Sequence, residues 1–195
     1  MIIGLTGTMG AGKGEVSSYL QKKGFKYISI SDIIREEIKK RNRPFRREEL
    51  QNLGNELRKE HGEGYWAKIV CEKIDVRQKW IIDSIRNPGE IEELKKIPNF
   101  FLIGIDAPRE TRLRRARKRK RVHDGRLSTD PLSEEELKKV ESRDRGVNEP
   151  EYGQQVLKCI ERADFKIMNE TSLEALYEKI EDILMKMYPK RSMLK

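Results

Sequence analysis

A glycine-rich loop near the start of the chain has the composition of a phosphate-binding loop. Residues 7–15 match the pattern GxxxxGK. Glycines let the backbone fold tightly and aim its N–H groups at phosphate oxygens, and the lysine adds a charge near the β- and γ-phosphates. An apolar run (2–6) precedes the loop and an amphipathic stretch (13–23) follows it, which is the strand–loop–helix context that this motif needs. We expect all nine residues to bind nucleotide phosphates: Gly7, Thr8, Met9, Gly10, Ala11, Gly12, Lys13, Gly14 and Glu15.

Two pairs of an acid and an arginine stand at the ends of two further apolar runs. Asp32 and Arg35 follow the run at 26–30, and Asp83 and Arg86 close another. Three-residue spacing at a helix start places both side chains on one face, where they can bind one ligand. A carboxylate at the exit of a buried strand is costly unless it is paired or bound to a metal. The structural alternatives are a helix cap at Asp32 with a solvated Arg35, and an Asp83–arginine pair.

The positive charge of the chain is concentrated in one internal segment. Between Arg109 and Arg121 there are nine basic residues and one acid, so this segment carries +8 of the net charge of +9. Arg112, Arg115 and Arg119 recur at three- and four-residue spacing and form one stripe of a helix. A basic tail would bind nucleic acid or an anionic membrane by electrostatics, but this segment lies between predicted elements.

Short apolar runs alternate with amphipathic stretches along the chain. This alternation predicts an α/β fold, with a parallel sheet covered by helices on both faces and ligands at the carboxyl ends of the strands. We expect five strands, at 2–6, 26–30, 79–84, 100–106 and 165–168. We expect helices at 13–23, 32–41, 46–59, 64–77, 88–97, from 108, from 133, at 151–163 and at 172–186, with an irregular segment at 123–131.

Composition excludes several classes of protein. A chain of 195 residues fits one domain with a sizeable core, and it has no apolar run near the ~20 residues of a membrane span. Cys71 and Cys159 are far apart, and His61 and His123 have no ligand-spaced partner, so neither a disulfide framework nor a zinc site is predicted. With no export signal before the first strand, we expect a cytoplasmic protein.

These features together resemble the nucleoside monophosphate kinases, which include the adenylate kinases. Those kinases carry Asp-x-x-Arg after the second strand and Asp-(x)-Phe-Pro-Arg after the third, and the two acid–arginine pairs match these patterns. The resemblance implies that Arg35 and Arg86 bind the phosphate of an acceptor. It also implies that Asp83 holds Mg²⁺ through water, with Asp32 as a further metal-site residue. Glu15 stands where adenylate kinases have a threonine, which leaves the metal geometry open.

The match is closer still to the P-loop kinase-like domain found alone or fused to deoxycytidylate deaminases. Three markers carry it: Asn-Glu-Leu-Arg at 55–58, Asp-Ser-Ile-Arg-Asn-Pro-Gly-Glu at 83–90, and Lys-Cys-Ile-Glu-Arg-Ala-Asp at 158–164. This resemblance spans residue 2 to about residue 184, and it adds Arg58 to the acceptor-binding set.

In such kinases an arginine-bearing helix leads into a lid that closes over ATP. Arg115 and Arg119 resemble the Arg-x-x-x-Arg at the lid entrance and would stabilise charge on the transferring phosphoryl group. Arg143 or Arg145 is a second lid candidate, and Asn169, after the fifth strand, is a candidate for contact with adenine. An ordinary turn is the structural alternative for Asn169.

The resemblance implies a three-layer P-loop NTPase fold in a single domain over residues 1–195. Its core would comprise residues 1–31, 78–120 and 150–188, its helical acceptor-binding region residues 32–77, and its arginine-rich lid residues 115–148. The implied activity is transfer of the γ-phosphoryl group of ATP, with Mg²⁺, to a nucleoside or deoxynucleoside monophosphate. The implied catalytic residues are Lys13, Asp83, Arg115 and Arg119.

Two alternatives stay open. In a dephospho-CoA kinase, Asp32 would accept the proton of an attacking hydroxyl. An adenylate-kinase-like ATPase associated with RNA or the ribosome would use the basic residues that a lid does not need, for which a solvated helix face is the structural alternative. RNA is therefore a secondary expected partner, no membrane partner is expected, and the sequence does not predict the oligomeric state.

Overall fold

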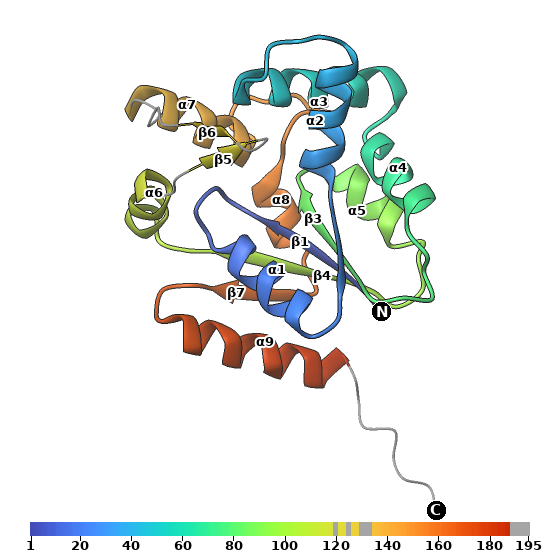
Figure 1. The fold of residues 1–195 in the computed structure, drawn as a ribbon, viewed down its shortest axis with the longest axis vertical. Coiled ribbons are helices and arrows are strands. Elements are labelled where there is room, and N and C mark those ends of the chain that lie inside the picture. Colours follow the sequence, from blue (N-terminus) through green and yellow to red (C-terminus); the bar gives the residue numbers. More distant parts are fainter. Residues whose placement is uncertain (119–120, 124–125, 129–133, 188–195) are drawn as a thin grey trace, which may run out of the picture.

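Five parallel strands form the central sheet, as predicted, and the structure places them in the order β2-β3-β1-β4-β7 (Figure 1). The computed structural model describes residues 1–118, 121–123, 126–128 and 134–187. The central strand β1 is buried throughout, as expected of a parallel strand with helices on both sides. The strands are β1 (Ile2–Gly7), β2 (Lys26–Ser29), β3 (Trp80–Ile85), β4 (Phe100–Asp106) and β7 (Phe165–Met168).

Helices cover both faces of the sheet, and alternate residues of β1 enter two separate cores. Ile3 and Leu5 pack in one core with residues of α1 (Lys13–Lys22) and α9 (Leu173–Met187). Ile2 packs in the other core, to which α5 (Pro88–Leu94) and α8 (Val156–Glu161) also contribute. Because successive side chains of a strand point to opposite faces of the sheet, helices pack on both faces, and the architecture has three layers.

Three helices stand over one end of the sheet and occupy the region predicted to bind an acceptor (Figure 1). They are α2 (Ile30–Lys40), α3 (Arg47–His61) and α4 (Tyr65–Lys73). The indole N–H of Trp66 donates a hydrogen bond to the Gly54 carbonyl oxygen over 3.1 Å, which fixes α4 against α3. This region is thereby joined to the same core as α5 and α8.

Two expectations for the second half of the chain are wrong. The segment expected to be irregular at 123–131 includes the last residue of strand β5 (Arg121–His123) and the strand β6 (Arg126–Ser128), which pair as an antiparallel hairpin. Its polar sequence lacks the apolar alternation that reveals a half-buried strand. The helix expected at 151–163 begins only at Val156, because Pro150 and Gly153 form a turn in which the Gly153 N–H donates to the Pro150 carbonyl oxygen.

The arginine-rich helix α6 (Arg109–Lys118) and helix α7 (Glu134–Arg145) flank this hairpin in the chain. They lie beside the end of the sheet where the glycine-rich loop emerges (Figure 1). Among the helices that the structure describes, none is both long and apolar enough to span a bilayer.

Candidate active site

The glycine-rich loop folds around backbone conformations that require glycine. Gly10 and Gly12 have φ angles of 79° and 108°, in the left-handed region. A Cβ atom at Gly10 would lie 2.4 Å from the carbonyl oxygen of Arg112, and one at Gly12 would lie 2.3 Å from Nδ2 of Asn169. The loop is therefore pressed against α6 on one side and against the residue that follows β7 on the other.

Lys13, the first residue of α1, folds its ammonium group back toward this loop. Its Nζ donates to the carbonyl oxygens of Gly7, at 2.5 Å, and Thr8, at 3.1 Å. Removal from water lowers the pKa of Lys13 to about 8; the charge of Arg86 also lowers it, while Asp83 and Asp144 raise it. Arg86 and Asp83 therefore lie close enough to Lys13 for their charges to act on it.

Asp83 lies in the C-terminal half of the buried strand β3, and the charge of its carboxylate acts on Lys13. The Ser84 N–H donates to Oδ1 over 2.5 Å, and the Tyr27 hydroxyl donates to Oδ2 over 3.0 Å. Ser84 has a φ of 66°, a left-handed conformation that is rare for a buried serine, and the register of β3 against β1 shifts here. Burial, followed by the charge of Asp83, raises the pKa of Tyr27, so Tyr27 stays a hydrogen-bond donor.

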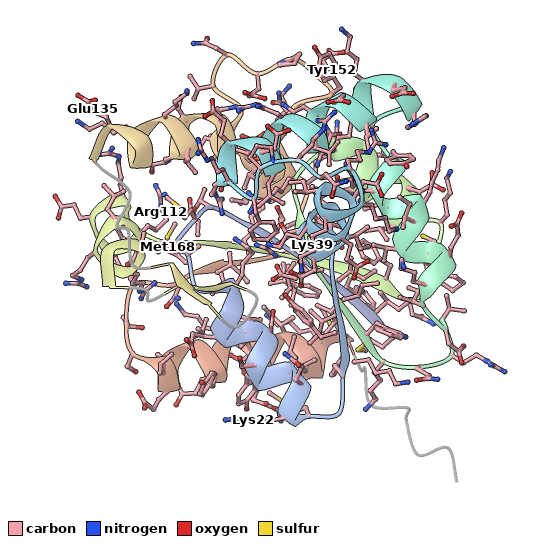
Figure 2. All side chains as sticks on the ribbon, turned by 45° about the horizontal axis from the view of Figure 1, so that its top comes forward. Lys22, Lys39, Arg112, Glu135, Tyr152 and Met168 are labelled. Atoms are coloured by element: carbon pink, nitrogen blue, oxygen red, sulfur yellow. The ribbon has the colours of Figure 1, made fainter. Side chains whose placement is uncertain are left out.

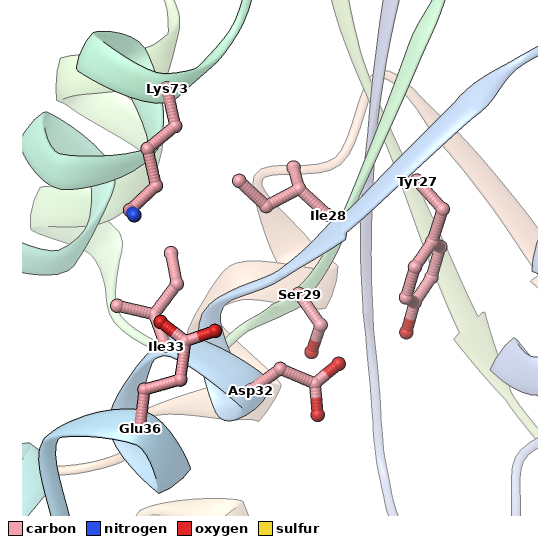
Figure 3. A pocket seen from close by; sticks show the side chains of 7 residues that line it. All are labelled: Tyr27, Ile28, Ser29, Asp32, Ile33, Glu36 and Lys73. Atoms are coloured by element: carbon pink, nitrogen blue, oxygen red, sulfur yellow. The ribbon is translucent and has the colours of Figure 1, made fainter.

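A cavity of about 210 Å³ opens beside β2 and α2 (Figure 3). Figure 3 shows the Asp32 carboxylate, the Ser29 hydroxyl and the Tyr27 ring on one side of this cavity. Tyr27 lines this cavity and donates to Asp83, while Asp32 lines it and pairs with Arg35. The lining residues are Tyr27, Ile28, Ser29, Asp32, Ile33, Glu36 and Lys73.

Arg86 follows β3 and is 9% exposed, and its guanidinium is paired with the buried carboxylate of Asp144 on α7. Arg47, at the start of α3, approaches the same Asp144 Oδ1 over 3.5 Å. The side chains of Arg86 and Arg47 are 11% and 28% exposed. Two cations from different elements therefore converge on one anion next to Lys13.

Arg58 does not reach the site surface in this structure. It is 1% exposed, and its Nε and Nη2 atoms lie 2.9 and 2.8 Å from Oε1 of Glu90, which is also buried. Oε2 of Glu90 accepts hydrogen bonds from the backbone N–H groups of Arg86, at 2.8 Å, and Asn87, at 3.1 Å. Arg58, which we expected to contact an acceptor, instead binds Glu90. Through Glu90 it holds the backbone of Arg86 in place.

Arg115 and Asn169 lie together beside the glycine-rich loop. Arg115 donates to the Asn169 carbonyl oxygen over 3.2 Å and to Oδ1 over 3.4 Å, while Nδ2 of Asn169 donates to the Ala11 carbonyl oxygen over 2.8 Å. Asn169 is 6% exposed, and its side chain is engaged with the loop and with Arg115. Arg119, the second predicted lid arginine, lies outside the described residues.

Arg143 contacts the helical region instead of the loop. Its Nε lies 2.8 Å from Oε1 of Glu149, and its Nη1 donates to Oδ1 of Asn52 over 2.9 Å. Arg143 therefore links α7 to α3. Glu15 is exposed in the first turn of α1, where its negative charge interacts favourably with the positive end of the helix dipole.

Sequence reasoning missed four polar residues around the loop: Tyr27, Arg47, Asp106 and Asp144. Asp106 had a readable signal, because it ends the fourth apolar run as Asp83 ends the third. Its Oδ1 accepts from the Thr8 hydroxyl over 2.6 Å and lies 3.5 Å from Nε of Arg112. Arg112, labelled on α6 in Figure 2, is 2% exposed, so this member of the basic stripe is a buried support for the loop.

A phosphate-binding loop between β1 and α1, acids at the ends of β3 and β4, and arginines around them define a P-loop kinase-like protein. The family model described as an AAA domain matches residues 3–141. A UPF0200 protein of Sulfurisphaera tokodaii is 35% identical over 183 residues, covering 94% of this chain and 95% of the relative. The UPF0200 protein PYRAB09750 of Pyrococcus abyssi is 35% identical over 193 residues, covering 95% and 96%. The chain belongs to the UPF0200 family.

The fold is shared with solved kinases of low sequence identity. Shikimate kinase from Aquifex aeolicus superposes with a TM-score of 0.54 at 18% identity, over 95% of this chain and 97% of the kinase. This likeness confirms the predicted three-layer fold with five parallel strands. The association with deoxycytidylate deaminases stays a prediction.

Proposed function

We propose that this protein transfers the γ-phosphoryl group of ATP to a small phosphorylated acceptor, a nucleoside or deoxynucleoside monophosphate. One observation carries the proposal: the site combines a phosphate-binding loop with a second group of cations. Lys13 and the loop lie at the end of β1, while Arg86 and Arg47 converge from β3 and α3. A simple ATPase needs the first group only, whereas a phosphotransferase must bind two anions.

The residues present fit a Mg²⁺–nucleotide complex. Mg²⁺ prefers oxygen donors, usually one or two carboxylates completed by water and substrate phosphates. Asp83 supplies a carboxylate at the site, and each of its oxygens accepts one hydrogen bond and retains a lone pair. The described residues contain no group of three or more His, Cys, Asp or Glu able to hold a metal alone, which agrees with a metal that arrives with its nucleotide. When bound, Mg²⁺ neutralises charge on the phosphates.

The chain's own residues position the two substrates. The loop N–H groups and Lys13 bind the phosphates of the donor, and Arg115 adds a guanidinium beside the loop. Arg86 and Arg35 bind the phosphate of the acceptor, because planar guanidinium groups make paired contacts to phosphate. Arg58 acts through Glu90 on the backbone of Arg86 and is a positioning residue.

The reaction itself asks for alignment and little covalent work. The acceptor oxygen forms a bond to the γ-phosphorus while the bond from that phosphorus to the β-bridging oxygen breaks, and ADP leaves. An acceptor phosphate gives up no proton at neutral pH. An acceptor hydroxyl would pass its proton to Asp32, which lines the cavity beside Tyr27.

The test is release of ADP from MgATP in the presence of a panel of acceptors. The panel contains the ribo- and deoxyribonucleoside monophosphates and dephospho-CoA. We expect release above the acceptor-free rate with one class of nucleoside monophosphate, and its loss in Asp83→Asn. A response to dephospho-CoA alone would replace the proposed acceptor.

No acceptor-dependent release, together with RNA binding that survives Lys13→Met and falls steeply with salt, would overturn the phosphotransferase. It would favour the RNA-associated ATPase instead. Arg162→Met is the matched control variant, because Arg162 pairs with Glu92 on an exposed surface, at 50% and 66% side-chain exposure.

A further inference from the structure

The carboxylate of Asp144 is a fully buried charged group of the candidate site. Asp144 lies in the last turn of α7 and has 0% exposure. Its Oδ1 accepts from Arg86 and faces Arg47 at 3.5 Å. Arg86 and Arg47 stand 58 and 97 positions away in the sequence, so three separate elements meet at this carboxylate.

The hydrogen bonding of Asp144 is incomplete. Its Oδ2 is buried and has no hydrogen-bond partner among the described residues. Glu90, the other fully buried carboxylate nearby, uses both oxygens: Oε1 binds Arg58, and Oε2 accepts two backbone N–H groups. A buried acceptor without a partner is destabilising, so Asp144 lacks the satisfied hydrogen bonding that Glu90 has.

The surroundings of Asp144 favour an anion with more charge and more acceptor oxygens. The charges of Arg86, Arg47 and Asp144 all act on Lys13, which places this cluster next to the loop lysine. A phosphate monoester carries nearly two negative charges and three terminal oxygens, whereas a carboxylate carries one charge and two oxygens. A phosphate can therefore offer the two arginines more negative charge and more acceptor oxygens than the single carboxylate of Asp144 does.

We propose that Arg47 and Arg86 form a phosphate clamp for the acceptor, and that Asp144 is an internal anion that competes with the acceptor phosphate for this clamp. The inference deepens the proposed function and rests on it. It assigns the converging Arg47 and Arg86 to the acceptor phosphate itself. It also proposes that Asp144 opposes binding of the acceptor instead of supporting it.

Release of Asp144 also changes the attachment of α7. The C-terminal part of this helix is tied to α3 by Arg143 with Asn52 and to the core by Asp144 with Arg86. An acceptor phosphate that binds Arg86 breaks the ion pair of Arg86 with Asp144, while the hydrogen bond of Arg143 with Asn52 remains. Occupation of the clamp is thereby coupled to the attachment of the C-terminal part of α7.

The test measures binding of inorganic phosphate by calorimetry, without ATP. We expect Asp144→Asn to bind phosphate about tenfold more tightly than the unmodified protein, because the competing charge is gone while the shape is kept. Arg47→Gln should bind about tenfold more weakly. Glu149→Gln removes a different ion pair of the same region, the one with Arg143, and should leave phosphate affinity unchanged.

Weaker or unchanged phosphate binding in Asp144→Asn would overturn the competition, because it would make Asp144 an orienting partner of the arginines. A second readout uses the unmodified protein, in case the variant fails to fold. Saturating phosphate should speed amide hydrogen exchange near the C-terminal end of α7, and unchanged exchange would contradict the release of Asp144.

These outcomes are separable from those of the acceptor panel. Tighter phosphate binding in Asp144→Asn with no acceptor-dependent ADP release would keep the clamp and reject the phosphotransferase. Acceptor-dependent ADP release with unchanged phosphate affinity in Asp144→Asn would keep the phosphotransferase and reject the competition by Asp144.

Discussion

At the scale of single residues, the charge state of Lys13 governs the donor side of the site. Its ammonium donates to two carbonyl oxygens of the loop, and its pKa of about 8 is far below the ordinary value for lysine. Removal from water and the neighbouring Arg86 both disfavour the proton. Nucleotide phosphates favour the charged form, so binding and protonation of Lys13 must be linked.

This linkage predicts a pH dependence of nucleotide binding. As pH rises through about 8, free Lys13 loses its proton, so the affinity for ATP should fall. At pH values just above that pKa, binding should take up a proton. Calorimetry in two buffers of different ionisation enthalpy measures this uptake, and an equal heat in both buffers would contradict it.

Lys13→Met separates the charge from the carbon chain of the side chain. It should weaken ATP binding about 10- to 100-fold, since a hydrogen bond to a charged group contributes about 1.5–3 kcal/mol, and abolish the proton uptake. Because the folded state depresses the lysine pKa, removing this charge should not lower the melting temperature of the free protein. Thermal melts with and without ATP check both expectations.

At the scale of elements, a buried ion pair links α3 to the start of α5 and supports Arg86. Asn87 and Glu90 form a capping box at the N-terminus of α5, and Oε1 of the same Glu90 binds Arg58 of α3. Both side chains of the pair are 0% exposed. A buried charge that loses its partner is strongly destabilising, whereas an exposed pair contributes little.

Arg58→Met should therefore lower the free energy of unfolding by about 3 kcal/mol. The control Arg162→Met breaks the exposed pair with Glu92 and should change that free energy by less than about 0.5 kcal/mol. Chemical denaturation measures both. Equal effects of the two variants would show that Glu90 does not depend on Arg58.

Asn169 connects two elements of the donor side, the glycine-rich loop and α6. It donates to Ala11 and accepts from Arg115, so Asn169→Ala frees both at once. We expect about tenfold weaker ATP binding with unchanged binding of inorganic phosphate, since the acceptor side keeps Arg86. Lys179→Met removes a hydrogen bond to the neighbouring Met168 carbonyl oxygen on an exposed surface and should leave ATP affinity unchanged. A loss of phosphate binding in Asn169→Ala would contradict this division of the site.

At the scale of the whole molecule, the sequence predicted what local patterns determine. The strands β1, β3 and β4 are mainly apolar, and the loop is a contiguous motif, so both could be read without knowledge of distant contacts. The acids that pair with the arginines could not be predicted from the sequence. Arg86 meets Asp144 58 positions away and Arg58 meets Glu90 32 positions away, and no periodicity encodes which acid an arginine will find. Arg58, which the resemblance places among the acceptor-binding residues, is 1% exposed and pairs with Glu90.

The charge of +8 between Arg109 and Arg121 is likewise only partly directed at a ligand. Arg112 is buried against Asp106 and Glu141, Arg109 pairs with Glu141, and Arg115 binds the loop through Asn169. This segment therefore supports the glycine-rich loop as well as adding positive charge.

A non-hydrolysable ATP analogue should slow amide hydrogen exchange in the glycine-rich loop and in residues 109–116 together. Protection of the loop alone would contradict the coupling of α6 to the nucleotide.

The central claim is that the γ-phosphoryl group of ATP moves to a second phosphorylated molecule and not to water. ATP labelled in its γ-phosphoryl group, incubated with the protein, Mg²⁺ and a nucleoside monophosphate, tests it most directly when the labelled products are separated. We predict label in a nucleoside diphosphate formed from the acceptor, and none there with Asp83→Asn. Label recovered only as inorganic phosphate, at a rate that does not depend on any acceptor of the panel, would contradict the claim.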